Sequence, residues 1–127
     1  MEGYVEFDDL SGRVIGCALT VHRALCPGLL ESAYEKCLAH ELVLNGIAFK
    51  LPHLLPVEYK GCRLDCGYRI DLLIEDRLIL ELKSVEQLKP IHEAQWLTYR
   101  WLARIRTGLL INFNVIRLKD GIKRLVL

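Results

Sequence analysis

Apolar residues recur at helical spacing through the first third of the chain. Residues 8–25 place apolar side chains three or four positions apart, which predicts an amphipathic helix that ends before Pro27. Residues 29–45 repeat this spacing and end in Asn45-Gly46, a typical C-terminal cap. The sequence therefore predicts two consecutive helices at the start of the chain.

The pattern changes at Ile47 to β-like runs separated by turn residues. The predicted strands lie within residues 47–51, 55–60, 63–74 and 77–85. Pro52, Lys60-Gly61 and Glu75-Asp76 separate these runs, so we expect a meander of antiparallel strands.

Pro90 then opens a third predicted helix over residues 90–105, because proline is well suited to the first helical position. Its apolar residues expected to face inward are Ile91, Ala94, Leu97, Trp101 and Ile105. Strands are predicted at 108–114 and over 115–127, the latter bent by the hairpin signal Asp120-Gly121. The order of elements predicts a single α/β or α+β domain over residues 1–127, with 1–8 as a loose extension.

The composition, 52% hydrophobic and 26% charged, is that of a globular protein and argues against disorder. No run approaches the roughly 20 apolar residues of a membrane helix, and the acidic N-terminus lacks a signal-peptide core. We therefore expect no membrane partner and a cytoplasmic location. Five cysteines without a secretory context predict reduced thiols, and Cys62 and Cys66 lack the second ligand pair of a structural zinc site.

The net charge of +1 hides an asymmetry between the two ends of the chain. Residues 1–50 carry seven acids and four bases, whereas residues 100–127 carry seven bases and Asp120 as their single acid. The bases are Arg100, Arg104, Arg106, Arg117, Lys119, Lys123 and Arg124. They can contact the backbone of an anionic partner or form a solvated polar face, and the charges alone favour the second interpretation.

Three ionisable residues interrupt the apolar strands of the segment 68–86, namely Asp71, Glu81 and Lys83. Because side chains alternate along a strand, Glu81 and Lys83 share a face of the predicted sheet. Asp71 lies opposite Glu81 on that same face only if the loop between the two strands has an odd number of residues, such as 75–77.

Two neighbouring carboxylates raise each other's pKa unless a cation lies between them. Hard oxygen ligands suit Mg²⁺ or Mn²⁺, and Lys83 can then orient an attacking water and stabilise developing negative charge. The alternative is that Asp71, Glu81 and Lys83 form ordinary ion pairs on a sheet face, and E-x-K alone favours that reading.

An Asp followed about ten residues later by Glu-x-Lys, with helices before and after, resembles the PD-(D/E)XK nuclease superfamily. The matching residues are Ile70-Asp71 and Glu81-Leu82-Lys83, with Ile70 where a proline is often found. "GLLESAY" at 28–34 also resembles the G-x-x-E-x-x-Y signature of the small GxxExxY family. The resemblance spans roughly residues 9–127 and implies a restriction-endonuclease-like core, a central mixed sheet flanked by helices in the order α-α-β-β-β-β-α-β-β.

The resemblance also implies a metal site. Glu31 would add a third carboxylate to Asp71 and Glu81, and the carbonyl of Leu82 would complete the ligands. Alternatively, Glu31 only stabilises the first turn of its helix through the helix dipole. Lys83 would assist the water.

Gln95 and Tyr99 match the Q-x-x-x-Y helix of RecB-like nucleases, which lies beside the active site. Their spacing of four places both on one helix face. His92 lies on the same face and is expected either to approach phosphate or to cap the helix.

Three functions follow as hypotheses. The first is a Mg²⁺- or Mn²⁺-dependent nuclease acting on DNA more than RNA, with Arg100 and Arg104 among the residues that position the strand. A twofold dimer would supply two sites for a duplex. The second is a catalytically silent module that binds nucleic acid or protein. The third is a hydrolase of a nucleotide or another small phosphate compound, although the chain has no Gly-rich phosphate loop.

Overall fold

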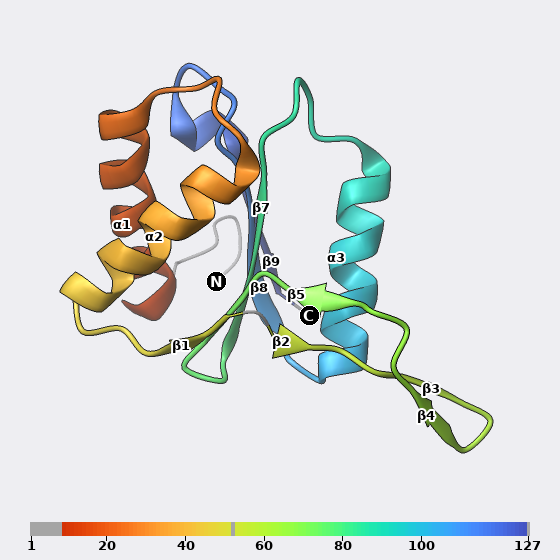
Figure 1. Cartoon of the computed structure of the whole chain (residues 1–127). Coiled ribbons are helices and arrows are strands. Elements are labelled where there is room, and N and C mark those ends of the chain that lie inside the picture. The colour runs from red at the N-terminus through yellow and green to blue at the C-terminus, as the bar shows by residue number, and fades with distance from the viewer. Residues whose placement is uncertain (1–8, 52, 127) are drawn as a thin grey trace, which may run out of the picture.

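Three helices flank a central sheet in the computed structural model, which describes residues 9–51 and 53–126. The predicted N-terminal extension, residues 1–8, lies outside the described residues. Helices α1 (Asp9–Leu25) and α2 (Glu31–Leu44) cover one face of the sheet, and α3 (Pro90–Ala103) covers the other (Figure 1). No helix of the described segments is both long and apolar enough to cross a membrane.

The central sheet has five strands in the order β1-β6-β7-β8-β9. These are Phe49–Lys50, Leu72–Ile74, Leu78–Lys83, Thr107–Asn112 and Ile122–Val126. β7 and β8 run parallel and α3 connects them, whereas the other neighbours are antiparallel. The predicted fold class, a central mixed sheet flanked by helices, is therefore confirmed.

The predicted meander is correct only in part. The run 55–60 pairs with 63–74, and 63–74 pairs with 77–85, as predicted, whereas 47–51 pairs with the end of 63–74 instead of with 55–60, so the strands are nested. β1 pairs with β6, β2 (His53–Leu54) with β5 (Arg69–Ile70), and β3 (Val57–Tyr59) with β4 (Cys62–Leu64). Lys60 and Gly61 both have positive φ, 48° and 81°, as a tight hairpin turn requires. The turn folds the chain back along itself, and the β3–β4 arm projects from the body (Figure 1).

Alternation along β7 divides its side chains between two apolar cores, as the sequence predicts. Leu78, Leu80 and Leu82 pack in the core on the side of α1 and α2. Ile79 packs with Trp96 and Tyr99 on the side of α3, so Glu81 and Lys83 belong to that second face.

The predicted inward face of α3 is wrong. Ile91 and Trp101 are 68% and 73% exposed, and Leu97 is exposed as well, whereas Trp96 and Tyr99 are buried. A Cβ atom at Gly108 of β8 would lie 2.0 Å from Trp96 Cζ2, so the indole occupies the space that this glycine leaves open. That fit between helix and sheet sets the rotation of α3.

The hairpin predicted at Asp120-Gly121 is also wrong. Leu118–Gly121 forms a 3₁₀ turn, η1, and β9 pairs with β8 instead of with residues 115–118. Leu118 is buried in the core beside α1 and α2, which draws this segment inward rather than along the sheet. The C-terminal strand is therefore the edge of the central sheet.

Candidate active site

Asp71 and Glu81 meet between β6 and β7, as the functional interpretation requires. Ile74 pairs with Leu78, so the intervening loop has three residues, 75–77, and the odd loop is confirmed. Glu75 and Asp76 both take positive φ in this loop. The same register places Asp71, which lies in a bend just before β6, opposite Glu81.

Reciprocal hydrogen bonds fix the two carboxylates. The backbone N–H of Asp71 donates to Glu81 Oε1 at 2.9 Å, and the backbone N–H of Leu82 donates to Asp71 Oδ2 at 2.9 Å. Each carboxylate thus accepts a backbone N–H at the point where the hydrogen-bonded ladder between β6 and β7 ends. Both carboxylates are held by main chain, which limits their rotation.

The two carboxylates are electrostatically strained. Burial raises the pKa of Glu81 to about 8, and the charge of Asp71 adds to that increase. Burial also raises the pKa of Asp71, while the Leu82 hydrogen bond and Lys83 lower it. A further positive charge at this position would favour the ionised form of both groups.

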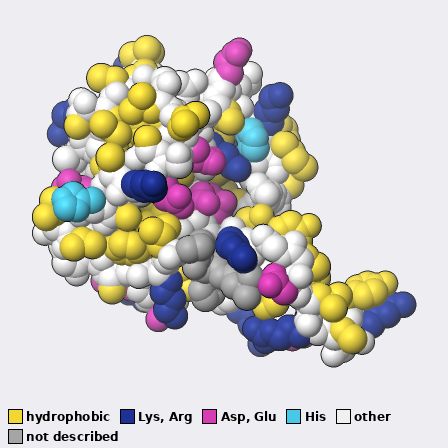
Figure 2. Space-filling model, viewed as in Figure 1, with side chains coloured by type: hydrophobic (Ala, Val, Ile, Leu, Met, Phe, Trp, Pro, Cys, Tyr) yellow, Lys and Arg dark blue, Asp and Glu magenta, His cyan; other side chains and the backbone are white. Residues whose placement is uncertain are grey.

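Glu31 joins these residues from the start of α2. Burial and then the charge of Asp71 raise the pKa of Glu31, whereas Lys83 lowers it. Glu31 also contributes to the raised pKa of Glu81. Figure 2 shows acidic side chains meeting at the centre of the visible face, between the part that carries α1 and α2 and the part that carries α3.

The turn between α1 and α2 is fastened at several points, which places Glu31. Gly28 has a φ of 106°, a conformation that side chains disfavour. The Tyr34 hydroxyl donates to the Cys26 carbonyl at 2.6 Å and accepts the Leu29 N–H at 3.1 Å. Ser84, directly after β7, donates its hydroxyl to the Leu29 carbonyl at 2.6 Å. The turn is thereby attached to the strand end that carries Lys83.

Tyr34 is itself fully buried and stacks on Phe113, with ring centroids 4.6 Å apart. Its hydroxyl contacts the turn and its ring fills the core, so it supports the site without reaching it. Gly28 and Tyr34 of the 28–34 motif thus fix the turn before α2, and Glu31 is the first residue of the helix that follows this turn.

Glu35 is a fourth carboxylate at the site that sequence reasoning missed. Burial raises its pKa, followed by the charges of Asp71 and Glu31. The signal was its spacing of four from Glu31, which places both on one face of α2.

Gln95 and Tyr99 border the site from α3. Gln95 Nε2 donates to the Tyr99 hydroxyl at 3.0 Å. Burial and the charge of Glu81 raise the pKa of Tyr99, in line with its place near the carboxylates. The Tyr68 ring lies 6.1 Å from that of Tyr99 and is partly exposed. The predicted Q-x-x-x-Y pair therefore lies beside Glu81.

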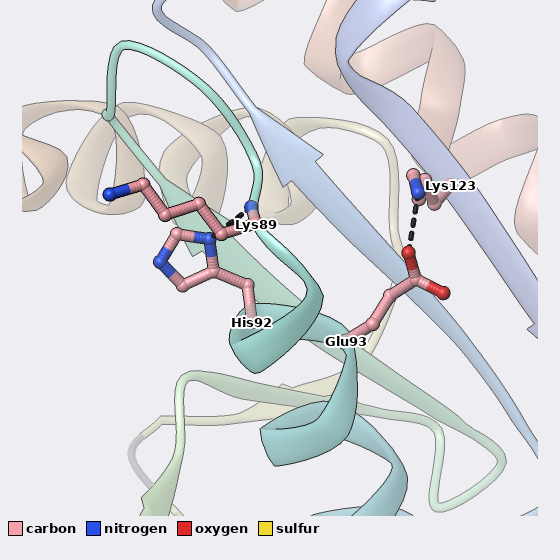
Figure 3. Close-up of polar contacts among 4 residues, drawn as sticks. All are labelled: Lys89, His92, Glu93 and Lys123. Atoms are coloured by element: carbon pink, nitrogen blue, oxygen red, sulfur yellow. Dashed lines mark hydrogen bonds and ion pairs between the residues drawn. The ribbon is translucent and has the colours of Figure 1, made fainter.

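His92 caps the start of α3 (Figure 3). Its Nδ1 accepts the backbone N–H of Lys89 at 2.9 Å, so the ring's other nitrogen is the one left for a ligand. In the next position Glu93 forms an ion pair with Lys123 of β9, which ties α3 to the sheet edge. The hydrogen bond between Lys89 and His92 supports the capping interpretation of His92, and the role of His92 in binding substrate stays a prediction.

Arg100 and Arg104 do not lie among the carboxylates. They line a separate groove at the end of α3, together with Arg106. Lys123 is engaged with Glu93. The C-terminal bases are thus divided among several places rather than forming one face.

The donor set suits a divalent cation in its chemistry. Asp71, Glu81 and Glu31 offer hard carboxylate oxygens, and burial is the main cause that raises the pKa of each. In the described part of the chain, however, no three Asp, Glu, His or Cys side chains are gathered closely enough to form a metal cluster. One oxygen of Asp71 and one oxygen of Glu81 each accept a backbone N–H.

Comparison with known proteins identifies the family. The sequence model of the PD-(D/E)XK nuclease superfamily matches residues 8–125, nearly the whole chain. No curated protein and no solved structure gives a significant match.

Proposed function

Because the chain belongs to the PD-(D/E)XK nuclease superfamily, we propose that it is a metal-dependent nuclease that hydrolyses phosphodiester bonds of nucleic acid. One observation carries the proposal: Asp71 and Glu81 are braced side by side, and the pKa of Glu81 is raised to about 8. A buried carboxyl pair of this kind is costly for a fold, which is typical of functional sites. Lys83 follows two residues later on the same strand face.

Asp71, Glu81, Glu31 and the carbonyl of Leu82 would hold Mg²⁺ or Mn²⁺. The bound ion would supply Lewis-acid stabilisation of the negative charge that develops on the phosphate. These residues would bind it with Glu81 ionised, through the carboxylate oxygens that do not accept the backbone N–H groups.

Lys83 would orient the attacking water and stabilise charge on the phosphate. Its ammonium lowers the pKa of Glu31, Asp71 and Glu81, so it lies within electrostatic reach of all three. A cation this close to the carboxylates is well placed to face the same phosphate that they approach through an ion.

Substrate would be positioned from α3. The Gln95 amide and the Tyr99 hydroxyl form a hydrogen-bonded pair beside Glu81 and would contact the strand near the cleaved bond, as in RecB-like nucleases. His92 would reach phosphate through Nε2, and Arg100 with Arg104 would contact the strand farther away.

Finer assignments belong to the same proposal. Gly28, Glu31 and Tyr34 support membership of the GxxExxY family, since each has a distinct part in the turn before α2. We further propose a single nuclease-like domain over 1–127, a cytoplasmic location, DNA in preference to RNA, and a twofold dimer for cutting both strands.

A second candidate is a silent module that binds nucleic acid or protein on a nuclease-like fold. The observation that favours it is that Asp71 and Glu81 each accept a backbone N–H, while the described residues contain no group of three side chains close enough to hold a metal ion. Cleavage assays separate the two candidates.

The test is incubation of the purified protein with labelled single- and double-stranded DNA and RNA in Mg²⁺, Mn²⁺ or EDTA. We expect metal-dependent cleavage that Lys83→Ala abolishes, with Lys119→Ala, an exposed residue of η1, as the matched control. Cleavage retained in Lys83→Ala would refute the role of Lys83. No cleavage of any substrate would favour the silent module.

A further inference from the structure

A groove separate from the carboxylates lies at the end of α3, beside the β3–β4 arm. Its volume is about 1010 Å³, and four arginines line it, Arg63, Arg100, Arg104 and Arg106, against Glu58 as the acid among its lining residues. Pockets for small ligands have volumes of about 300–1,000 Å³, so this groove lies at the upper limit of that range.

The arginines come from two elements and bring excess positive charge together. Arg100 lies in the last turn of α3, and Arg104 follows as its C-cap with a φ of 61°, so both lie at the C-terminal end of the helix. Arg63 on β4 lies directly opposite Glu58 on β3. Arg63, Arg100 and Arg104 form no ion pair with any carboxylate in the described segments. Guanidinium groups gathered in this way are suited to phosphate oxygens.

Trp101 distinguishes this groove from a plain basic patch. Its indole is 73% exposed although it lines the groove, and the half-buried Pro56 adds apolar surface beside it. An exposed aromatic ring among arginines is the combination that binds unpaired bases, because a base can stack on the ring only when it is not paired in a duplex.

The groove adjoins the helix that carries the Gln95–Tyr99 pair. Leu55 lines the groove and packs in the same apolar cluster as Tyr99. Arg100, which lines the groove, directly follows Tyr99 in α3. A strand seated in the groove therefore lies within a few nucleotides of the Gln95–Tyr99 pair.

We propose that this groove binds a single-stranded segment of nucleic acid, with Trp101 stacked on a base and Arg63, Arg100 and Arg104 on successive phosphates. The substrate of the site would then be single-stranded, or a duplex with a single-stranded tail. The part of this inference that names the substrate rests on the proposed nuclease function, whereas binding by the groove does not.

The intrinsic fluorescence of tryptophan gives a direct test in EDTA, where no cleavage takes place. The chain has two tryptophans, and Trp96 is buried while Trp101 is exposed. We expect a single-stranded 12-mer to quench the emission of Trp101, and Trp101→Phe to remove the quenching. Titrations with single-stranded DNA and single-stranded RNA distinguish the two sources of the same backbone chemistry.

Binding of labelled 12-mers, followed by fluorescence anisotropy, tests the individual residues. Trp101→Ala should weaken single-strand binding about five- to hundredfold. Arg63→Gln and Arg104→Gln should each lower the slope of log affinity against log salt by about 0.7. Arg117→Gln is the matched control, because it removes the same exposed charge outside the groove.

The results separate this inference from the nuclease proposal. Binding that depends on the groove, in a protein that cleaves nothing, would keep the groove and refute the nuclease. Cleavage with unaltered single-strand binding in Trp101→Ala, Arg63→Gln and Arg104→Gln would refute the groove alone. Equal affinity for a blunt duplex, or no binding of any oligonucleotide, would also overturn the inference.

Discussion

The buried Glu81 should make the protein less stable as pH rises, and Glu81→Gln should remove most of that dependence. In the folded chain burial and Asp71 raise the pKa of this carboxyl to about 8, whereas the unfolded chain has a value near 4.5. Between those values the folded state keeps a proton that the unfolded state releases. Stability is therefore highest below the unfolded pKa and falls as pH rises towards the folded pKa.

The magnitude follows from the width of that window. Each pH unit changes the free energy of unfolding by about 1.4 kcal/mol, so the window of roughly three units between pH 5 and pH 8 amounts to about 4 kcal/mol. Asp71, Glu31 and Glu35 have raised pKa values as well and act in the same direction. Gln at position 81 can still accept the Asp71 N–H and has no proton to lose.

The assay is urea unfolding at pH 5.0, 6.5 and 8.0 in EDTA, followed by far-ultraviolet circular dichroism. The decrease in stability should be smaller in Glu81→Gln than in the wild type, and Glu86→Gln, an exposed carboxyl nearby, should behave as the wild type. Saturating Mn²⁺ should reduce the decrease, since an ion favours the ionised carboxylates. Parallel stability profiles for the wild type and Glu81→Gln would refute the reasoning.

Three further substitutions test the supports of the site. Gly108→Ala places a Cβ in the ring of Trp96 and should lower the free energy of unfolding by about 2–3 kcal/mol; an unchanged urea midpoint would contradict the packing. Tyr34→Phe leaves two backbone groups of the turn without their partner and should cost about 1–3 kcal/mol, with weaker Mn²⁺ binding by titration; wild-type values for both would exclude this role. The Asn112 side-chain amide accepts the Val85 N–H and donates to the Val85 carbonyl directly after β7, so Asn112→Ala should accelerate hydrogen exchange at the Val85 N–H at least tenfold; unchanged exchange would contradict this pairing.

The sequence predicted what depends on local periodicity. The face of Glu81 and Lys83 followed from the alternation of side chains in β7, and the ends of α2 followed from its spacing and its Asn45-Gly46 cap. The sequence predicted that Asp71 lies opposite Glu81 only if the loop between their strands has an odd number of residues. The residues around 75–77 do not specify whether that number is odd or even, and the structure shows three.

What the sequence did not predict depends on packing between distant segments. The rotation of α3 is set by Trp96 against Gly108, twelve positions later, and helical spacing alone carries no sign of that fit. β1 pairs with β6, a strand distant from it in the sequence, and the turn signals between them do not specify that partner. The place of Glu35 near Asp71 depends on how α2 packs against the sheet, which helical spacing alone does not specify.

The β3–β4 arm has a practical consequence for engineering. β3 and β4 pair with each other in a two-stranded sheet of their own, and the turn at Lys60-Gly61 lies at its exposed tip. Exposed turns of this kind tolerate added residues, because lengthening them disturbs no buried backbone. A peptide tag or a fluorescent label can therefore be inserted at this tip with the central sheet intact, which offers a handle for immobilising the protein with its carboxylates accessible.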